Sequence, residues 1–203
     1  MPTVVIPFAG EAGNSRVRGS ESARRRLSLA MLGDVLAAAA AVGAALVVVT
    51  PDAEAAAIAR ALGAEIVADP GGGQGLAVAA ALADLEPGPI LILNADVPCV
   101  VPDDLLALLA ATPAGGIALV EALDGTTNAL SLPSAEAFAP LYGPGSARRF
   151  LTRASELGLE AVVVALPNLA EDIDTLDDLH RLQPRCGPRT QACLVDVPVG
   201  ATR

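Results

Sequence analysis

Short, continuously apolar runs alternate with Ala- and Leu-rich segments along this chain, and that alternation constrains the fold more than any other feature. The runs predict strands at Thr3–Phe8, Ala44–Thr50, Glu65–Ala68 and Pro89–Leu93. Composition and capping residues predict helices at Glu21–Ala41, Pro51–Leu62, Leu76–Leu85 and Pro102–Ala111. Since apolar strands separated by helices are typical of parallel sheets covered on both faces, the first half predicts an α/β fold.

The second half indicates that the sheet becomes mixed. Gly116–Ala122 and Asn128–Leu132 are expected to pair as a hairpin around the Asp124-Gly125 turn. Further elements are predicted as helices at residues 134–139, 146–157 and 175–182 and a strand at residues 161–166. We expect one domain over residues 1–183, and a loose C-terminal tail over residues 184–203 because that segment is rich in Pro and Gly.

Composition limits the possible partners. The 203 residues are 53% hydrophobic, enough for a buried core, while aromatic residues make up 2% and the net charge is -10. A negative chain with few aromatic rings lacks the basic face and the stacking platforms of nucleic-acid binders, so nucleic acid is not an expected partner. All thirteen basic residues are Arg. Any phosphate site must therefore use Arg, backbone N–H groups or metal ions.

The sequence favours a cytoplasmic protein that does not enter a membrane. The start of the chain lacks the pattern of a signal peptide, and the longest apolar stretch divides at Gly43 into a helix end and a strand. Three cysteines without paired metal-ligand spacing fit a reducing compartment. The apolar-rich composition also allows a homodimer surface.

The segment ILILNADVP contains the first candidate for chemistry. A buried strand brings Asn94 and Asp96 to its carboxyl end, which is the usual ligand edge of an open α/β sheet. Asp96 is therefore a candidate metal ligand. An Asx turn or a cap for the following helix explains this Asp equally well when the segment is considered alone.

The segment EDIDTLDDL contains a second acidic pattern between a strand and a helix. Asp172 and Asp174 occupy alternate positions of an extended stretch, so both carboxylates can face one way and hold a hard cation such as Mg²⁺. Acidic and Thr residues before a helix are also frequent caps, and Thr175, Asp177 and Asp178 are expected to cap the last helix.

Two Gly-rich segments are candidates for nucleotide binding. The loop PFAGEAGNSRV can direct backbone N–H groups at phosphates and contribute Arg16, with Phe8, Ala9 and Gly10 at its start. A plain surface loop is the alternative. The turn at residues 70–75 supplies Gly73 and Gly75 as further candidates.

The segments GTTNAL and YGPGSARRF are candidates for binding an anionic substrate. Thr127, Asn128, Gly143 and Ser146 offer small polar contacts, and the adjacent Arg148 and Arg149 offer cations near a helix start. A solvated helix face that balances nearby Glu residues is the alternative for the two arginines.

Taken in order, VVIPFAG, GNSRV, LAMLGDVL, NADVPC, DGTTNAL, YGPGSARRF and DIDTLDDL resemble the guanylyltransferases that act on phospholactate or phosphoenolpyruvate in the biosynthesis of coenzyme F-420. The resemblance spans about residues 3–182. It implies a nucleotide-diphospho-sugar-transferase-like, Rossmann-like three-layer α/β fold with a mixed, mainly parallel sheet. The implied reaction joins GMP from GTP to a small phosphorylated acid, which is phosphoenolpyruvate, 2-phospho-L-lactate or 3-phosphoglycerate, and releases pyrophosphate.

The resemblance also implies roles for individual residues. Asp96, Asp172 and Asp174 would bind Mg²⁺, and Thr127, Asn128, Gly143, Ser146 and Arg149 would line the pocket for the phosphorylated acid. The chain departs from the family pattern at Asn14, Ala77 and Arg149, where relatives usually have Lys, Asn and His. We expect Arg16 and Arg149 to compensate for the missing charge. The alternatives are another nucleotidyltransferase of this fold, of the cytidylyl or molybdopterin-guanylyl type, and a non-catalytic binding paralogue.

Overall fold

A computed structural model describes residues 2–10 and 20–195, and the described residues form one seven-stranded sheet. β1 pairs in parallel with β2 and β4, β2 with β3, and β5 with β7, whereas β6 runs antiparallel to both β4 and β5. The sheet is therefore mixed and mainly parallel, as predicted. In spatial order the strands are β3 (Glu65–Val67), β2 (Ala45–Val49), β1 (Thr3–Pro7), β4 (Ile90–Leu93), β6 (Thr127–Leu132), β5 (Ile117–Glu121) and β7 (Ala161–Val163).

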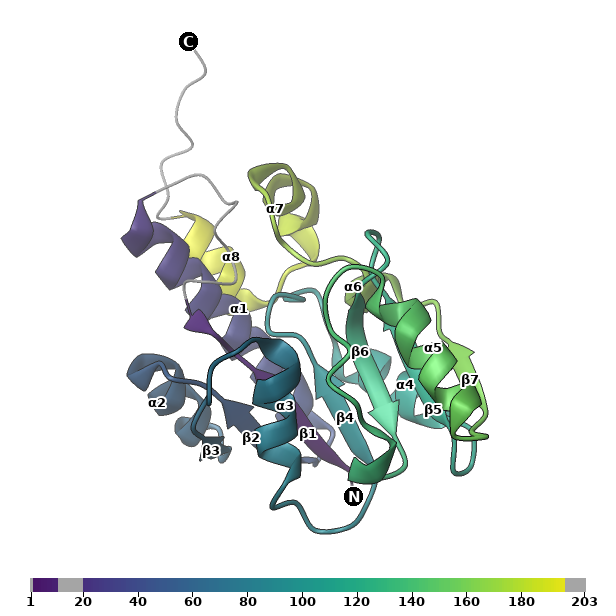
Figure 1. The fold of residues 1–203 in the computed structure, drawn as a ribbon. Helices are drawn as coiled ribbons and strands as arrows, with labels where there is room; N and C mark the ends of the chain where they lie inside the picture. The colour runs from purple at the N-terminus through teal and green to yellow at the C-terminus, as the bar shows by residue number, and fades with distance from the viewer. Residues whose placement is uncertain (1, 11–19, 196–203) are drawn as a thin grey trace.

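Helices cover both faces of this sheet, which confirms the three-layer α/β fold (Figure 1). One face packs against α1, α2 and α4, and the other packs against α3 and α5. Successive strand residues alternate between the two cores: Val4 and Ile6 belong to the first, and Val5 to the second. The helices are α1 (Glu21–Ala41), α2 (Ala53–Ala61), α3 (Gln74–Leu82), α4 (Pro102–Ala111), α5 (Ser146–Glu156), α6 (Pro167–Ala170), α7 (Leu176–Leu182) and α8 (Pro188–Val195).

Local signals placed most of these elements correctly. The side chain of Asp52 accepts from the backbone N–H groups of Glu54 and Ala55 at the start of α2, and Thr175 caps α7. The predicted hairpin is present, with a β-bulge between Val120 and Glu121. The helix expected at residues 134–139 is only a short 3₁₀ turn, η2 (Ala135–Ala137), and the short helix α6 was not predicted.

The prediction of a loose tail is wrong for its described part. Residues 184–195 include the end of the 3₁₀ turn η3 (Gln183–Arg185) and all of α8, which packs beside α1 (Figure 1). Cys186 is buried in a small core with Leu27, Met31 and Leu182. The buried carboxylate of Asp34 in α1 accepts from the backbone N–H groups of residues 189 and 190 at 3.0 and 2.8 Å, so it satisfies the start of α8.

Among the described residues, no helix combines the length and the hydropathy needed to cross a membrane.

Candidate active site

Three acidic side chains meet beside the carboxyl end of β4. Asp96 lies in the loop after β4, and Asp172 and Asp174 lie on the segment between α6 and α7. The backbone N–H of Ile173 donates to the carbonyl of Asp96 at 3.0 Å, and the Ile173 side chain is fully buried in the core. Because Ile173 points inward, its two acidic neighbours are presented on the other side, as the alternating pattern predicted.

One oxygen from each of Asp96, Asp172 and Asp174 lies within 4.8 Å of the others. Burial, followed by the charges of Asp172 and Asp174, raises the pKa of Asp96 to about 7. Burial and the charge of Asp174 raise the pKa of Asp172 to about 6. Asp96 Oδ1 is buried and has no hydrogen-bond partner among the described residues. An all-oxygen cluster with an unpartnered buried carboxylate oxygen fits a hard divalent cation.

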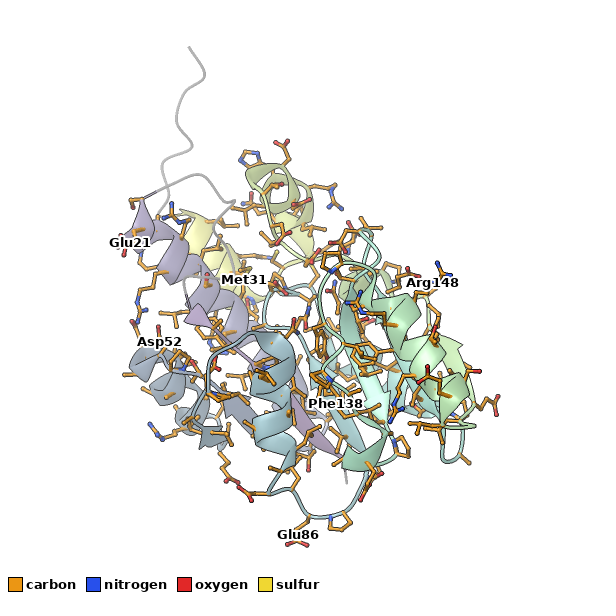
Figure 2. The ribbon with its side chains drawn as sticks, viewed as in Figure 1. Glu21, Met31, Asp52, Glu86, Phe138 and Arg148 are labelled. Carbon is orange, nitrogen blue, oxygen red and sulfur yellow. The ribbon has the colours of Figure 1, made fainter. Side chains whose placement is uncertain are left out.

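A cavity of about 410 Å³ extends from Asp96 along the carboxyl ends of the central strands. This is the point where the chain connections of an α/β sheet diverge, since β1 has β2 on one side and β4 on the other. Of the predicted nucleotide-binding residues, Phe8, Ala9, Gly10 and Gly73 line this cavity, and Arg16 lies outside the described residues, as does Asn14, a departure from the family pattern. Figure 2 shows Met31 on α1, and its side chain also lines the cavity.

A second cavity of about 400 Å³ adjoins the first and shares residues 72–74 with it. The predicted acid-binding residue Gly143 and the predicted nucleotide-binding residue Gly75 both line this second cavity. Gly75 is pressed against Pro140, whose backbone Cα would lie 2.9 Å from an added Cβ. A side chain at position 75 would therefore displace the wall of the second cavity.

A chain of hydrogen-bonded side-chain amides begins at Gln74, a residue common to the two cavities. Gln74 Nε2 donates to Asn94 Oδ1 at 2.6 Å, and Asn94 Nδ2 donates to Asn128 Oδ1 at 3.0 Å. Gln74 lines both cavities, Asn94 follows β4 directly, and Asn128 is buried in β6. These contacts connect the start of α3 to the antiparallel strand beside the acidic cluster.

The other predicted acid-binding residues lie around the start of α5. Thr127 and Ser146 are buried, and Ser146 Oγ donates to Thr127 Oγ1 at 3.1 Å. The Asn128 Nδ2 donor is buried without a partner among the described residues. The structure thus brings Thr127, Asn128 and Ser146 close together next to Gly143.

Arg149 has a contact pattern that sequence reasoning did not foresee. Its guanidinium donates to the carbonyl oxygens of Leu141, Tyr142 and Pro144. These bonds hold the loop that forms one wall of the second cavity, and this loop includes Gly143, whose φ is +108°. The neighbouring Arg148 is exposed and extends outward from α5 (Figure 2).

Several lining residues were missed by sequence reasoning. Gln74 and Asp69 lie on either side of the glycines of residues 71–73, and of this turn the sequence indicated Gly73 and Gly75 alone as candidates. Asn94 had been noted as delivered together with Asp96, but its amide partners lie far along the sequence. The polar residues on either side of the glycines were the available signal for Asp69 and Gln74.

An α/β sheet covered by helices on both faces, with an acidic cluster beside a cavity at its central strands, is an arrangement suited to binding a nucleotide together with a hard cation. Solved structures of two transferases share this fold. A protein assigned to the nucleotide-diphospho-sugar transferases from Desulfovibrio desulfuricans G20 has a TM-score of 0.73 at 16% identity, with 97% of this chain and 95% of that chain covered. A nucleotidyl transferase from Methanothermobacter has a TM-score of 0.65 at 18% identity, with 97% and 99% covered.

The sequence comparisons identify the family within this class. The family model described as "Guanylyl transferase CofC like" matches residues 2–185, and the chain belongs to that family. It is 38% identical to a phosphoenolpyruvate guanylyltransferase of Nocardia farcinica, with 86% of this chain and 80% of the relative covered. It is 42% identical to an enzyme of the same name from Roseiflexus castenholzii, with 81% and 78% covered.

Proposed function

We propose that this enzyme transfers GMP from GTP to phosphoenolpyruvate or a closely similar phosphorylated acid, with release of pyrophosphate, in coenzyme F-420 biosynthesis. The observation that carries the proposal is the cluster of Asp96, Asp172 and Asp174 at the end of a cavity large enough for a nucleotide. The names of the relatives support GTP and phosphoenolpyruvate as the substrates. The free cysteines and the biosynthetic role support a cytoplasmic location.

Asp96, Asp172 and Asp174 would hold Mg²⁺ in the proposed reaction. When bound, the metal neutralises charge on the triphosphate and on the leaving pyrophosphate. The chain supplies the oxygen ligands and fixes their positions, since the Ile173–Asp96 backbone bond connects the two segments that carry them. The all-Arg basic residues and the net charge of -10 leave few other groups for neutralising a triphosphate.

The two cavities suggest how the substrates are arranged. The first would hold GTP, with its α-phosphate toward Asp96, against Phe8, Ala9, Gly10 and Gly73. The second, with Gly143 in its wall, would hold the phosphorylated acid, and Thr127, Asn128 and Ser146 lie beside it as small polar groups. Gln74 would lie between the two substrates because it lines both cavities.

The chemical step needs no proton-accepting side chain. A phosphate oxygen of the acid attacks the α-phosphorus of GTP; the new P–O bond forms as the bond to the β-phosphate oxygen breaks, and its electrons leave with pyrophosphate. The attacking phosphate is already ionised near neutral pH. Catalysis therefore consists mainly of positioning and charge stabilisation.

The test is pyrophosphate release from GTP with Mg²⁺ and, separately, phosphoenolpyruvate, 2-phospho-L-lactate or 3-phosphoglycerate. Asp96→Ala and Asp174→Ala should each reduce acceptor-dependent release by at least about 100-fold, since each removes a metal ligand. Asp177→Ala, an exposed acid on α7, is the matched control and should keep wild-type activity. If no pyrophosphate is released with any of the three acids, the proposal is contradicted.

A further inference from the structure

We infer that Asp69 selects guanine over the other bases by accepting hydrogen bonds from its N1–H and 2-amino groups. The inference rests on the proposed function, because it requires GTP in the first cavity with its α-phosphate beside Asp96. Asp69 lies in the same cavity, beyond the carboxyl end of β3.

The position of Asp69 suits the base end of the nucleotide. β3 and β4 are separated by β2 and β1 in the sheet, so their carboxyl ends lie three strand spacings apart, or about 14 Å. Asp96 follows β4 and Asp69 follows β3, and both line one continuous cavity. A nucleoside monophosphate bound with its phosphate at Asp96 therefore extends its base toward Asp69.

The other polar side chains that line this cavity are committed to protein partners or to the acidic cluster. Gln74 and Asn94 belong to the amide chain, and Ser28 donates to the carbonyl of Arg24 at 3.0 Å. Asp69 Oδ1 accepts from the backbone N–H of Gly71 at 2.8 Å. A carboxylate has about four acceptor sites, so this turn orients the Asp69 group and leaves it able to accept more hydrogen bonds.

The glycines after Asp69 keep its surroundings open. Gly71, Gly72 and Gly73 all have positive φ, at +78°, +83° and +101°. This run of left-handed conformations strongly favours glycine, so the three residues at 71–73 add no side chains of their own to the cavity between Asp69 and Gln74. A flat base can thus lie against the turn and reach the carboxylate.

A carboxylate discriminates guanine from the other bases by its hydrogen-bond pattern. Guanine presents two adjacent donors, N1–H and the 2-amino group, whereas adenine presents an acceptor at N1 and cytosine an acceptor at N3. Uracil offers one donor between two carbonyls. A carboxylate pairs fully with guanine alone and faces a lone pair or a carbonyl oxygen in the others.

Asp69→Asn provides a test in which specificity should invert. The amide keeps an oxygen for N1–H but places a donor where the 2-amino group was, and xanthine carries an acceptor oxygen at that position. Pyrophosphate release with phosphoenolpyruvate is measured for GTP, ITP and XTP. We expect kcat/KM of the variant to fall at least about 30-fold with GTP and to become higher with XTP than with GTP.

Wild-type enzyme should also use ITP about 10-fold less well than GTP, because inosine lacks the 2-amino group. Asp84→Asn is the matched control: it changes an exposed acid near the end of α3 and should keep the wild-type order of substrates. An Asp69→Asn variant that retains the wild-type preference for GTP over XTP would overturn the inference.

Failure of the proposed reaction can be distinguished from failure of this inference. If the wild type turns over none of the three nucleotides, the proposed function fails and melting-temperature shifts with GDP and XDP in the presence of Mg²⁺ still test Asp69. Stabilisation by GDP in the wild type and by XDP in Asp69→Asn would support the base contact. Equal responses of the two proteins to both ligands would reject it.

Discussion

The ionised carboxylate of Asp96 destabilises the folded protein when no metal is bound. Its Oδ1 is buried and unpartnered, and two further acids lie close to it. Such a cluster is less costly when protonated or when a cation neutralises it. The three residues proposed to bind the metal are therefore expected to destabilise the folded protein when no metal is bound.

This cost predicts a pH dependence of stability. The pKa of Asp96 is raised to about 7 and that of Asp172 to about 6 in the folded protein, against about 3.9 in an unfolded chain. Between pH 4 and 7 the folded state thus binds more protons than the unfolded state, so the unfolding free energy contributed by these groups falls as pH rises. The metal-free wild type should lose several degrees of melting temperature relative to Asp96→Asn between pH 5 and pH 8.

The comparison with Asp96→Asn cancels groups that titrate elsewhere. Mg²⁺ should raise the melting temperature of the wild type more at pH 8 than at pH 5.5, because protons compete with the metal for the carboxylates. Parallel pH profiles for the two metal-free proteins would contradict the assignment of the raised pKa values.

Sequence alone predicted that Asp172 and Asp174 can face one way, and the structure places both close to Asp96, but it did not predict the polar contacts of the neighbouring amide side chains. Asp172 and Asp174 are two residues apart on an extended segment, where every second side chain faces the same side, so their common orientation could be inferred from the sequence. The amide chain through Gln74, Asn94 and Asn128 depends on side chains from three separate elements. No local pattern encodes such contacts, and they become visible only when the strand order is known.

At the scale of elements, α8 shows how one buried charge positions a helix. Asp34 lies in the middle of α1, and its carboxylate accepts from the backbone N–H groups of Arg189 and Thr190. Gly187 packs directly on this carboxyl, where a Cβ would overlap it. The Arg189 guanidinium in turn donates to the carbonyl of Gly33. Together these contacts fix α8 on α1.

Asp34→Ala should therefore destabilise the protein strongly. The backbone N–H groups of Arg189 and Thr190 would lose the buried Asp34 carboxylate as their acceptor. This loss should lower the free energy of unfolding by about 3 kcal/mol and the melting temperature by about 6 to 12 °C. Asp34→Asn keeps one oxygen acceptor and should lose about half as much. Urea unfolding of both variants measures the change, and Asp84→Ala, at an exposed position, should stay within about 0.5 kcal/mol of the wild type. A wild-type unfolding free energy for Asp34→Ala would exclude this role.

The missed helix illustrates the limit of local signals. α1 and α4 were predicted from composition and caps, and their bounds agree with the structure. The segment after residue 183 contains Pro and Gly and has no strong apolar period, so it was interpreted as a tail. Its order comes from Asp34 and from a small core with α1, which are tertiary contacts that no window of the sequence contains.

At the scale of the whole molecule, the net charge of -10 sets the field that a substrate meets. GTP and a phosphorylated acid are both anions, so the protein as a whole repels them at low ionic strength. Salt screens this repulsion, since the Debye length falls from about 30 Å at 0.01 M to about 8 Å at 0.15 M. We expect kcat/KM to rise about two- to three-fold over this range at constant Mg²⁺.

Initial rates at subsaturating GTP and acid, measured across a KCl series, check this expectation. The melting temperature should be followed in the same series to show that the fold itself is unaffected. A fall of kcat/KM with added salt would indicate instead that a local positive field attracts the substrates.

The acidic cluster combines Asp96 with two residues from near the end of the chain, so it can form only late in synthesis. Ribosomes synthesise the chain from its N-terminus at about 5–20 residues per second, so β1 to β4 and the glycine turn at residues 71–73 emerge well before Asp172 and Asp174. A nascent chain with the nucleotide cavity but without residues 172–174 holds a single carboxylate of the cluster. On the proposed mechanism, a copy that lacks residues 172–174 would not turn over GTP, and activity would begin only when synthesis is nearly complete.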